Sequence, residues 1–262
     1  MTSTLETPVA DASPLWQAYG RHVDGLFTYC LSVLCDHDAA VAAVGEVRDL
    51  ALRHGARLAD PALRRAWLYA LARHCCLRRL ERGPGAAGAQ APEARPGALA
   101  QRRTELARLA WPEAAGTGPE QREALELAVR HRLSPAEVAA VLGLTATAAE
   151  QVLAAAGAEV ARTRTALLVL GVGNCPELAQ LGGVGAESWR GWVLGPALRR
   201  ELVLHVVRCP TCRGTAARVA GELDSGLAGL PGLPLLTAPA AVRTAVSAPQ
   251  APDGAAGAAF LA

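Results

Sequence analysis

Three side chains that can bind a metal ion lie close together near the end of this 262-residue chain. The stretch reads His205-Val-Val-Arg-Cys209-Pro-Thr-Cys212, a His-x3-Cys-x2-Cys pattern. On a helix, the first two of these side chains stand four residues apart and therefore share a face. The turn between the two cysteines contains Pro210, which limits its conformational freedom. The spacing predicts that three ligands converge on one point.

A fourth ligand is needed to complete a tetrahedral site, and Cys175 is the candidate that the sequence offers. It lies next to Pro176 at the start of another expected helix, so that a helical hairpin would bring it to the cluster. Thiolates and imidazole suit zinc, and four protein ligands leave no open coordination position. The sequence therefore predicts a structural Zn²⁺ ion held by Cys175, His205, Cys209 and Cys212. The alternative is a helix in which the same residues are ordinary core.

The other four cysteines, Cys30, Cys35, Cys75 and Cys76, fall on the apolar faces of expected helices and are predicted to be core residues. An odd total of seven, unevenly spaced, favours free thiols and metal ligands over disulfides. Residues 1–14 show no signal-peptide pattern, and no apolar run approaches the ~20 residues of a membrane span. A cytoplasmic protein without membrane contact is expected.

Composition and periodicity predict an all-α protein. Half of the residues are hydrophobic but only 4% are aromatic, so that the cores are expected to consist mainly of Ala, Leu and Val. Apolar residues recur at helical spacing, and no stretch reads as a convincing strand. All 26 basic residues are Arg, which is typical of high-GC coding and makes the Arg content weak evidence for nucleic-acid binding. Because the net charge is only +2, any such contact requires a local patch.

Five segments follow one another along the chain. A three-helix domain is predicted over 15–82, followed by a Gly- and Pro-rich flexible linker over 83–118 that contains a short helix near 99–109. A second helical domain is predicted over 119–168, the metal-binding domain over 171–227 and a disordered Pro- and Ala-rich tail over 228–262.

Strong helix signals mark both helical domains. In the first, Asp60 and Pro61 provide a cap and a first-turn proline for a helix over 62–82. In the second, a helix over 120–131 is followed by Ser134-Pro-Ala-Glu137, a capping box.

The capping-box helix is expected to end at Gly143, a residue suited to a left-handed cap. Thr145 or Thr147 is expected to start the next helix, and Thr147–Glu150 reads as a second capping box. These elements outline a helix-turn-helix.

The helix over 62–82 is one candidate surface for nucleic acid. It carries one acid, Glu81, and interleaves Trp67 and Tyr69 with six arginines: Arg64, Arg65, Arg73, Arg78, Arg79 and Arg82. Guanidinium groups attract phosphates, and aromatic rings stack on unpaired bases. The alternative is an amphipathic helix with a solvated Arg face.

The expected recognition helix, 146–161, is a weaker candidate. It contains Glu150 and Glu159 but no Arg, whereas a helix in the major groove normally needs basic or amide groups. Gln151 is the side chain able to read a base, and Arg162 stands beyond the end of the helix, where it could reach a phosphate. A protein-binding module is an equal alternative.

Together these segments resemble the extracytoplasmic-function group of sigma-70 factors over residues 15–168. Tyr19-Gly-Arg-His-Val-Asp-Gly-Leu-Phe27 is similar to the opening of sigma region 2. Arg65-Ala-Trp-Leu-Tyr-Ala-Leu-Ala-Arg73 resembles the R-A-W-L-Y-x-I-A-R motif of that family, and residues 134–144 resemble the L-S-x-x-E-I-A-x-x-L-G-L segment of region 4. The stretch from Cys175 to Cys212 is similar to the zinc-binding anti-sigma fold, which some actinobacterial sigma factors carry at the C-terminus.

This resemblance implies a region 2 bundle, a linker that threads into polymerase, a region 4 helix-turn-helix bundle and a small helical zinc domain that regulates them in cis. The implied partners are core RNA polymerase and promoter DNA. The residues implied or proposed to contact DNA are Arg64, Arg65, Trp67, Tyr69, Arg73, His74, Arg78, Gln151 and Arg162.

Departures from the family pattern favour a second hypothesis. The acidic polymerase-binding helix of the family corresponds here to Asp38-Ala-Ala-Val-Ala-Ala-Val-Gly-Glu46, and its Lys-Ser-Arg corresponds to Glu150-Gln151-Val152. The chain would then be a sigma-derived regulator that binds a sigma or anti-sigma partner without reading promoters. No Ser/His/Asp arrangement, phosphate-binding Gly loop or open metal site indicates an enzyme.

Overall fold

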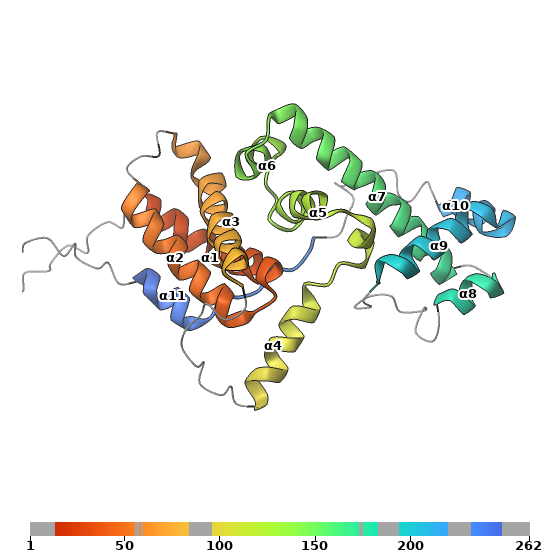
Figure 1. Cartoon of the computed structure of the whole chain (residues 1–262), viewed down its shortest axis with the longest axis horizontal. Coiled ribbons are helices and arrows are strands. Elements are labelled where there is room, and N and C mark those ends of the chain that lie inside the picture. The colour runs from red at the N-terminus through yellow and green to blue at the C-terminus, as the bar shows by residue number, and fades with distance from the viewer. Residues whose placement is uncertain are drawn as a thin grey trace, which may run out of the picture.

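In the computed structural model, every regular element within the described residues is a helix, which confirms the predicted all-α class for this part of the chain (Figure 1). The described residues are 14–55, 58, 60–83, 96–172, 175–182, 194–219 and 232–247. Within these ranges, no single helix has the length and apolarity needed to cross a membrane. Helices α6 (Pro135–Leu142) and α7 (Ala146–Val172) meet this criterion only when they are counted together, and the chain bends between them.

The N-terminal bundle consists of α1 (Pro14–Leu34), α2 (His37–His54) and α3 (Arg64–Arg82), which pack against one another. The cap expected at Asp60 is confirmed. Asp36 accepts a hydrogen bond from the backbone N–H of Ala39, and Asp60 caps the 3-10 turn Pro61–Leu63 that leads into α3. The core of the bundle is filled by fully buried side chains, the largest being Tyr19, Leu26, Phe27, Tyr29, Leu31 and Leu68.

The second part of the expected flexible linker is packed. It contains α4 (Pro96–Arg108) and a 3-10 turn, Pro112–Gly116, that lies against α7. Trp111 and Ala114 are buried there, in a cluster with side chains of α5 (Pro119–Leu125) and α7. The Gly- and Pro-rich composition of this segment predicts a flexible linker and gives no sign that one short apolar stretch packs against neighbouring helices. Residues 84–95 of the expected linker lie outside the described residues.

The helix-turn-helix half begins with α5 (Pro119–Leu125) and continues into a π-helical turn, Glu126–Arg130. The prediction of one regular helix over 120–131 is therefore wrong for the last turn, which is π-helical. The capping box before α6 (Pro135–Leu142) is confirmed, because Ser134 and Glu137 exchange hydrogen bonds with each other's backbone N–H groups.

Gly143, with φ of +71°, ends α6 as expected. Helix α7 (Ala146–Val172) then leaves α6 at 106°, the arrangement of a helix-turn-helix. Thr145 caps α7 by accepting a hydrogen bond from the N–H of Ala148. The expected second capping box, Thr147–Glu150, is wrong because Thr147 already lies inside α7.

The C-terminal lobe consists of α8 (Pro176–Gly182), α9 (Pro196–Arg208) and α10 (Pro210–Val219). Helices α9 and α10 pack against α7, which runs into the lobe without a break (Figure 1). The boundary expected after residue 168 therefore lies inside a helix.

The expected disordered tail is partly wrong. Residues 232–247, called here the C-terminal strap, return to the N-terminal bundle and end in α11 (Ala240–Ser247), which packs on α1 and α2 (Figure 1). Leu236, Ala238 and Val242 are buried in the main core. Burial of these three apolar side chains stabilises the packed strap, although its Pro- and Ala-rich composition favours disorder. Residues 248–262 lie outside the described residues.

Candidate metal centre

Helix ends position all four expected ligands. Cys175 precedes α8, and its carbonyl oxygen accepts the backbone N–H of Ala179 at 3.1 Å. His205 lies in the last turn of α9. Cys209 joins α9 to α10: its N–H donates to the carbonyl of His205 at 2.8 Å, and its own carbonyl accepts the N–H of Arg213 at 2.9 Å. The local hydrogen bonds thus fix the directions of the ligand side chains.

The ligand atoms of Cys175, His205, Cys209 and Cys212 all lie within 4.8 Å of one another. The Sγ atom of Cys175 lies 3.3 Å from Nε2 of His205. Ligand atoms bound to one tetrahedral ion are separated by roughly 3–4 Å, given metal–ligand distances of about 2.0–2.3 Å. The cluster could therefore hold a metal ion, and the expected convergence of these four residues is confirmed.

The thiols of the cluster differ in their environments. The backbone N–H of Cys212, together with neighbouring thiols, hydrogen-bonds the sulfur of Cys209 and lowers its pKa, which favours the thiolate. Burial raises the pKa of Cys212 to about 12. Because metals bind thiolates, an ion binding here would have to displace the proton of Cys212, whereas the lowered pKa of Cys209 favours its deprotonation.

Sequence reasoning missed Glu177. One of its carboxylate oxygens lies 3.9 Å from Nδ1 of His205, while Nε2 of that imidazole faces Cys175. A carboxylate that hydrogen-bonds the outer nitrogen of a histidine ligand selects its tautomer, but 3.9 Å is longer than a hydrogen bond, so Glu177 lies beside this nitrogen without fixing the tautomer. The signal was an acid two residues after the first cysteine, on the exposed side of α8.

An apolar cluster supports the ligands. Leu178, Leu202 and Val206 of the C-terminal lobe pack with Leu167 and Leu170 of α7. Cys175 and Cys212 are themselves buried members of this cluster. The arrangement offers four protein ligands and a closed environment, which suits a structural ion rather than a catalytic one.

The other cysteines follow the expectation with one exception. Cys30, Cys75 and Cys76 are fully buried in the core of the N-terminal bundle. Cys35 is exposed, because it lies beyond the end of α1 in a left-handed conformation with φ of +52°. The expectation that it belongs to the core was wrong.

Three of the expected DNA-contacting residues lie between the N-terminal bundle and the helix-turn-helix half. Arg73 forms an ion pair with Glu123 of α5 at 2.9 Å, and Arg65 donates to the carbonyl oxygen of His131. The hydroxyl oxygen of Tyr69 lies 3.0 Å from Nδ1 of His131. In this conformation, these three α3 side chains bind protein.

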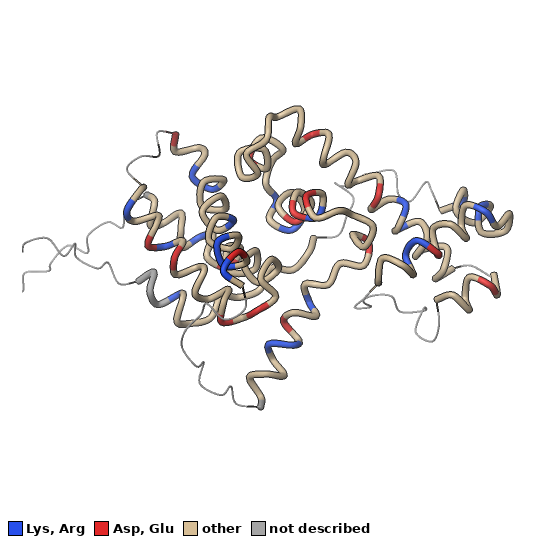
Figure 2. Tube along the Cα trace, in the orientation of Figure 1, with Lys and Arg blue, Asp and Glu red and all other residues tan. Residues whose placement is uncertain are grey.

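The remaining candidates are dispersed. Trp67 is half-buried against the core of its own bundle, whereas His74, Arg78 and Gln151 are exposed. Arg162 is exposed and pairs with Glu159, and Arg64 is half-buried. Basic positions recur along α3, but the first half of α7 has none (Figure 2). The structure therefore does not gather the two expected DNA surfaces on one face.

His131 is a central residue of this interface that sequence reasoning missed. Its side chain is fully buried, in contact with the rings of Tyr29 and Tyr69. Burial, reinforced by Arg130 and Arg65, lowers its pKa to about 3. The imidazole is therefore neutral near pH 7 and acts as a packing group.

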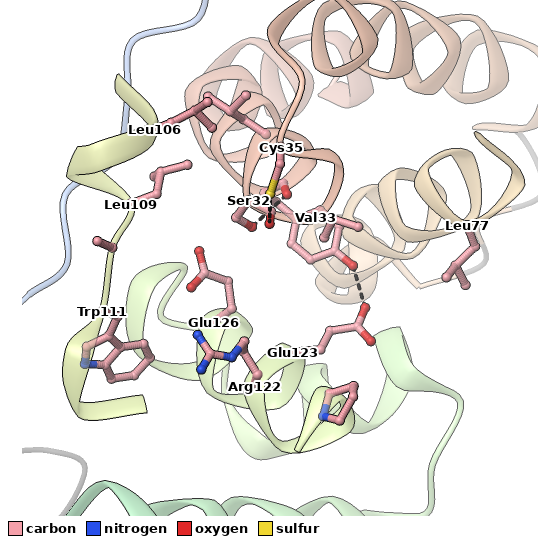
Figure 3. A pocket seen from close by; sticks show the side chains of 14 residues that line it. Ser32, Val33, Cys35, Leu77, Leu106, Leu109, Trp111, Arg122, Glu123 and Glu126 are labelled. Atoms are coloured by element: carbon pink, nitrogen blue, oxygen red, sulfur yellow. Dashed lines mark hydrogen bonds between the residues drawn. The ribbon is translucent and has the colours of Figure 1, made fainter. Parts of the chain in front are cut away.

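A cavity of about 560 Å³ remains where the two halves meet (Figure 3). Glu123 and Glu126 of the helix-turn-helix half face Ser32 and Val33 of α1 across it, and Trp111 closes one side. Burial raises the pKa of Glu126, although Arg130 opposes this effect. The cavity lies beside a packed contact, because the main core includes residues of both halves, such as Leu68 of α3 and Val138 of α6.

Comparison with known proteins gave no relative: no family model matches the chain, and no curated protein or solved structure is significantly similar to it.

Proposed function

We propose that the protein is a sigma-type transcription initiation factor, described here in a closed state. In this proposal, the N-terminal bundle binds core RNA polymerase and opens promoter DNA. The helix-turn-helix half binds the upstream promoter element. The C-terminal lobe, built on the end of α7, holds a structural Zn²⁺ ion and regulates the factor in cis.

One observation carries the proposal: two arginines of α3 are engaged by the helix-turn-helix half, Arg65 by the carbonyl oxygen of His131 and Arg73 by the carboxylate of Glu123. Nε of Arg64 and Nε of Arg65 are buried and have no hydrogen-bond partner among the described residues. Buried donors without partners cost free energy. A conformation in which these guanidinium groups meet phosphates removes this cost, so α3 is suited to nucleic acid once the halves separate.

Zinc is the ion that best fits the donor set. Three thiolates and one imidazole are borderline-soft ligands, and they select zinc over magnesium or calcium. The ion would tie α8, α9 and α10 together, and these helices share one small apolar cluster with the end of α7.

A second candidate function is a sigma-derived regulator that binds a protein partner without reading promoters. The first half of α7 supports it, because Glu150 and Gln151 are exposed there and the nearest Arg, Arg162, is engaged by Glu159. Such a surface is poorly suited to phosphates.

Transcription in vitro tests both candidates. The full chain is mixed with purified core polymerase and genomic DNA of the source organism, and the 5′ ends of the transcripts are sequenced. An initiation factor produces new start sites that share sequence elements upstream. Binding of polymerase or of a sigma factor without new start sites contradicts the first function and supports the second.

Exposed arginines provide a matched pair of variants for this experiment. Arg78→Ala removes a guanidinium group from α3 and is expected to weaken promoter binding and to lower its salt dependence by about one phosphate contact. Arg103→Ala on α4 removes the same charge elsewhere on the surface and should leave the transcripts unchanged.

A further inference from the structure

The C-terminal strap crosses the junction between the two halves. Leu233 packs with the apolar cluster of the helix-turn-helix half that includes Leu125 and Val160. Three residues later, Leu236 is buried in the main core, which α1, α2 and α3 share with side chains of the helix-turn-helix half such as Leu127 and Val138. One extended segment of the chain thus contributes side chains to the core shared by both halves and to a second cluster of the helix-turn-helix half.

Polar contacts fix the register of the strap on α1. The backbone N–H of Leu236 donates to Oγ1 of Thr28 at 2.9 Å. The N–H of Ala238 donates to Oδ1 of Asp24 at 2.8 Å, and Arg243 pairs with both oxygens of the same carboxylate. Asp24 and Thr28 lie four residues apart and form one face of the helix. This face therefore binds both the backbone and a side chain of the strap.

A separate contact reaches the helix-turn-helix half. Nη1 of Arg130 donates to the carbonyl oxygen of Pro234 at 2.9 Å. The same guanidinium group also donates to the carbonyl of Leu109 and pairs with Glu126. Arg130 thus connects the strap, the end of the linker and the π-helical turn.

We propose that residues 232–247 are an intramolecular latch that holds the N-terminal bundle and the helix-turn-helix half together. The Asp24–Thr28 face of α1 is its docking surface, and the occupant is this segment of the same chain. Burial of Leu236, Ala238 and Val242 supplies the apolar part of the binding, and Asp24 selects the register through Arg243. If the proposed function is right, the latch must release before α3 can meet DNA.

Two neighbouring leucines give a matched test in the full chain. Leu236 is 2% exposed, whereas Leu235 is 46% exposed. Leu236→Asp places a charge in the core and is expected to release the strap; Leu235→Asp places the same charge in solvent. Hydrogen–deuterium exchange is measured in peptides from α1 and from the π-helical turn Glu126–Arg130.

The latch predicts that Leu236→Asp accelerates exchange in both peptides by about tenfold or more, while Leu235→Asp leaves them unchanged. Equal exchange in both variants would overturn the proposal. Acceleration confined to α1 would also overturn it, because the strap would then stabilise one half without joining the two.

A charge reversal keeps the proposal testable if Leu236→Asp does not fold. Asp24→Arg and Arg243→Asp should each accelerate exchange in both peptides, and the double variant should restore at least part of the protection. Failure of the double variant to restore any protection contradicts the proposed register. These measurements require neither polymerase nor DNA, so that their result is independent of the transcription experiment.

Discussion

Cys209 is a ligand of the candidate metal centre and also the junction of two helices. Its backbone ends α9 and starts α10, and its thiol is ionised more readily than that of Cys212. Cys209 is half-buried and packs against the apolar cluster of the lobe from outside its buried members, so loss of this one sulfur removes a ligand while the buried members stay in place. This makes Cys209 the sharpest residue at which to test the site.

We expect Cys209→Ser to reduce bound zinc from one ion per chain to a small fraction and to lower the melting temperature by about 5–10 °C, because the free energy of ion binding stabilises the folded lobe. Elemental analysis and calorimetry measure both quantities. Cys35→Ser is the control, since that thiol is exposed and outside the cluster. Unchanged metal content in Cys209→Ser refutes the site.

His131 predicts a dependence of stability on pH. In the unfolded chain its imidazole binds a proton near pH 6.5, whereas burial lowers the pKa in the folded protein to about 3. Acid therefore favours unfolding between these values, by up to about 1.4 kcal/mol per pH unit. Stability from this source is complete above pH 6.5 and is lost as the pH falls.

The variant His131→Asn isolates this effect, because Asn retains an acceptor for Tyr69 but does not titrate. Between pH 6.5 and 5, the unfolding free energy of the natural protein should fall relative to that of the variant. A difference between the two proteins that is constant over this range would show that the imidazole is not buried in neutral form. Chemical denaturation at a series of pH values provides the measurement.

At the scale of elements, local signals predicted most helix starts. Asp60 and Ser134 cap helices as expected, and Asp36 caps α2, because each places a side-chain acceptor beside free backbone N–H groups. The stretch Thr147–Glu150 also matches the capping-box pattern, but it does not start a helix. Thr145 already caps α7 two residues earlier. The sequence pattern thus identifies the side chains that can cap a helix. In α7, the first of two such side chains along the chain is the one that caps it.

Ser134→Ala should lower the unfolding free energy by about 1 kcal/mol, because it leaves the N–H of Glu137 without its capping partner. Thr147→Ala should change it by less than about 0.5 kcal/mol, since Thr147 is exposed within α7. Urea denaturation compares the two variants. Equal losses in both would contradict the assignment of the helix start.

At the scale of the whole molecule, contacts between distant segments were beyond sequence reasoning. The four metal ligands could be predicted, because three share a short stretch and the fourth has a compatible chemistry. The pairing of Arg65 with the carbonyl of His131 and the burial of Leu236 could not, because both depend on how separate helices pack. The sequence predicted the helices within each half, but it did not predict that the N-terminal bundle packs against the helix-turn-helix half.

Removal of the metal tests whether the C-terminal lobe can lose its structure while the N-terminal bundle stays folded. Chelation should accelerate hydrogen exchange in α8–α10 and in the last two turns of α7, which share one apolar cluster. Exchange in the N-terminal bundle should stay unchanged, because the described bundle residues contribute nothing to that cluster. Faster exchange throughout the chain would show that the ion supports the closed state directly.

Helix α7 runs unbroken for 27 residues, a length of about 40 Å, from the helix-turn-helix corner to the metal ligands. An ion bound at the candidate metal centre would therefore lie at one end of this helix, and the expected recognition surface lies at the other end. Cobalt bound in place of zinc would then serve as a built-in spectroscopic marker. Its distance to a label on the N-terminal bundle would report the angle of α7 each time the protein engages a polymerase or a promoter.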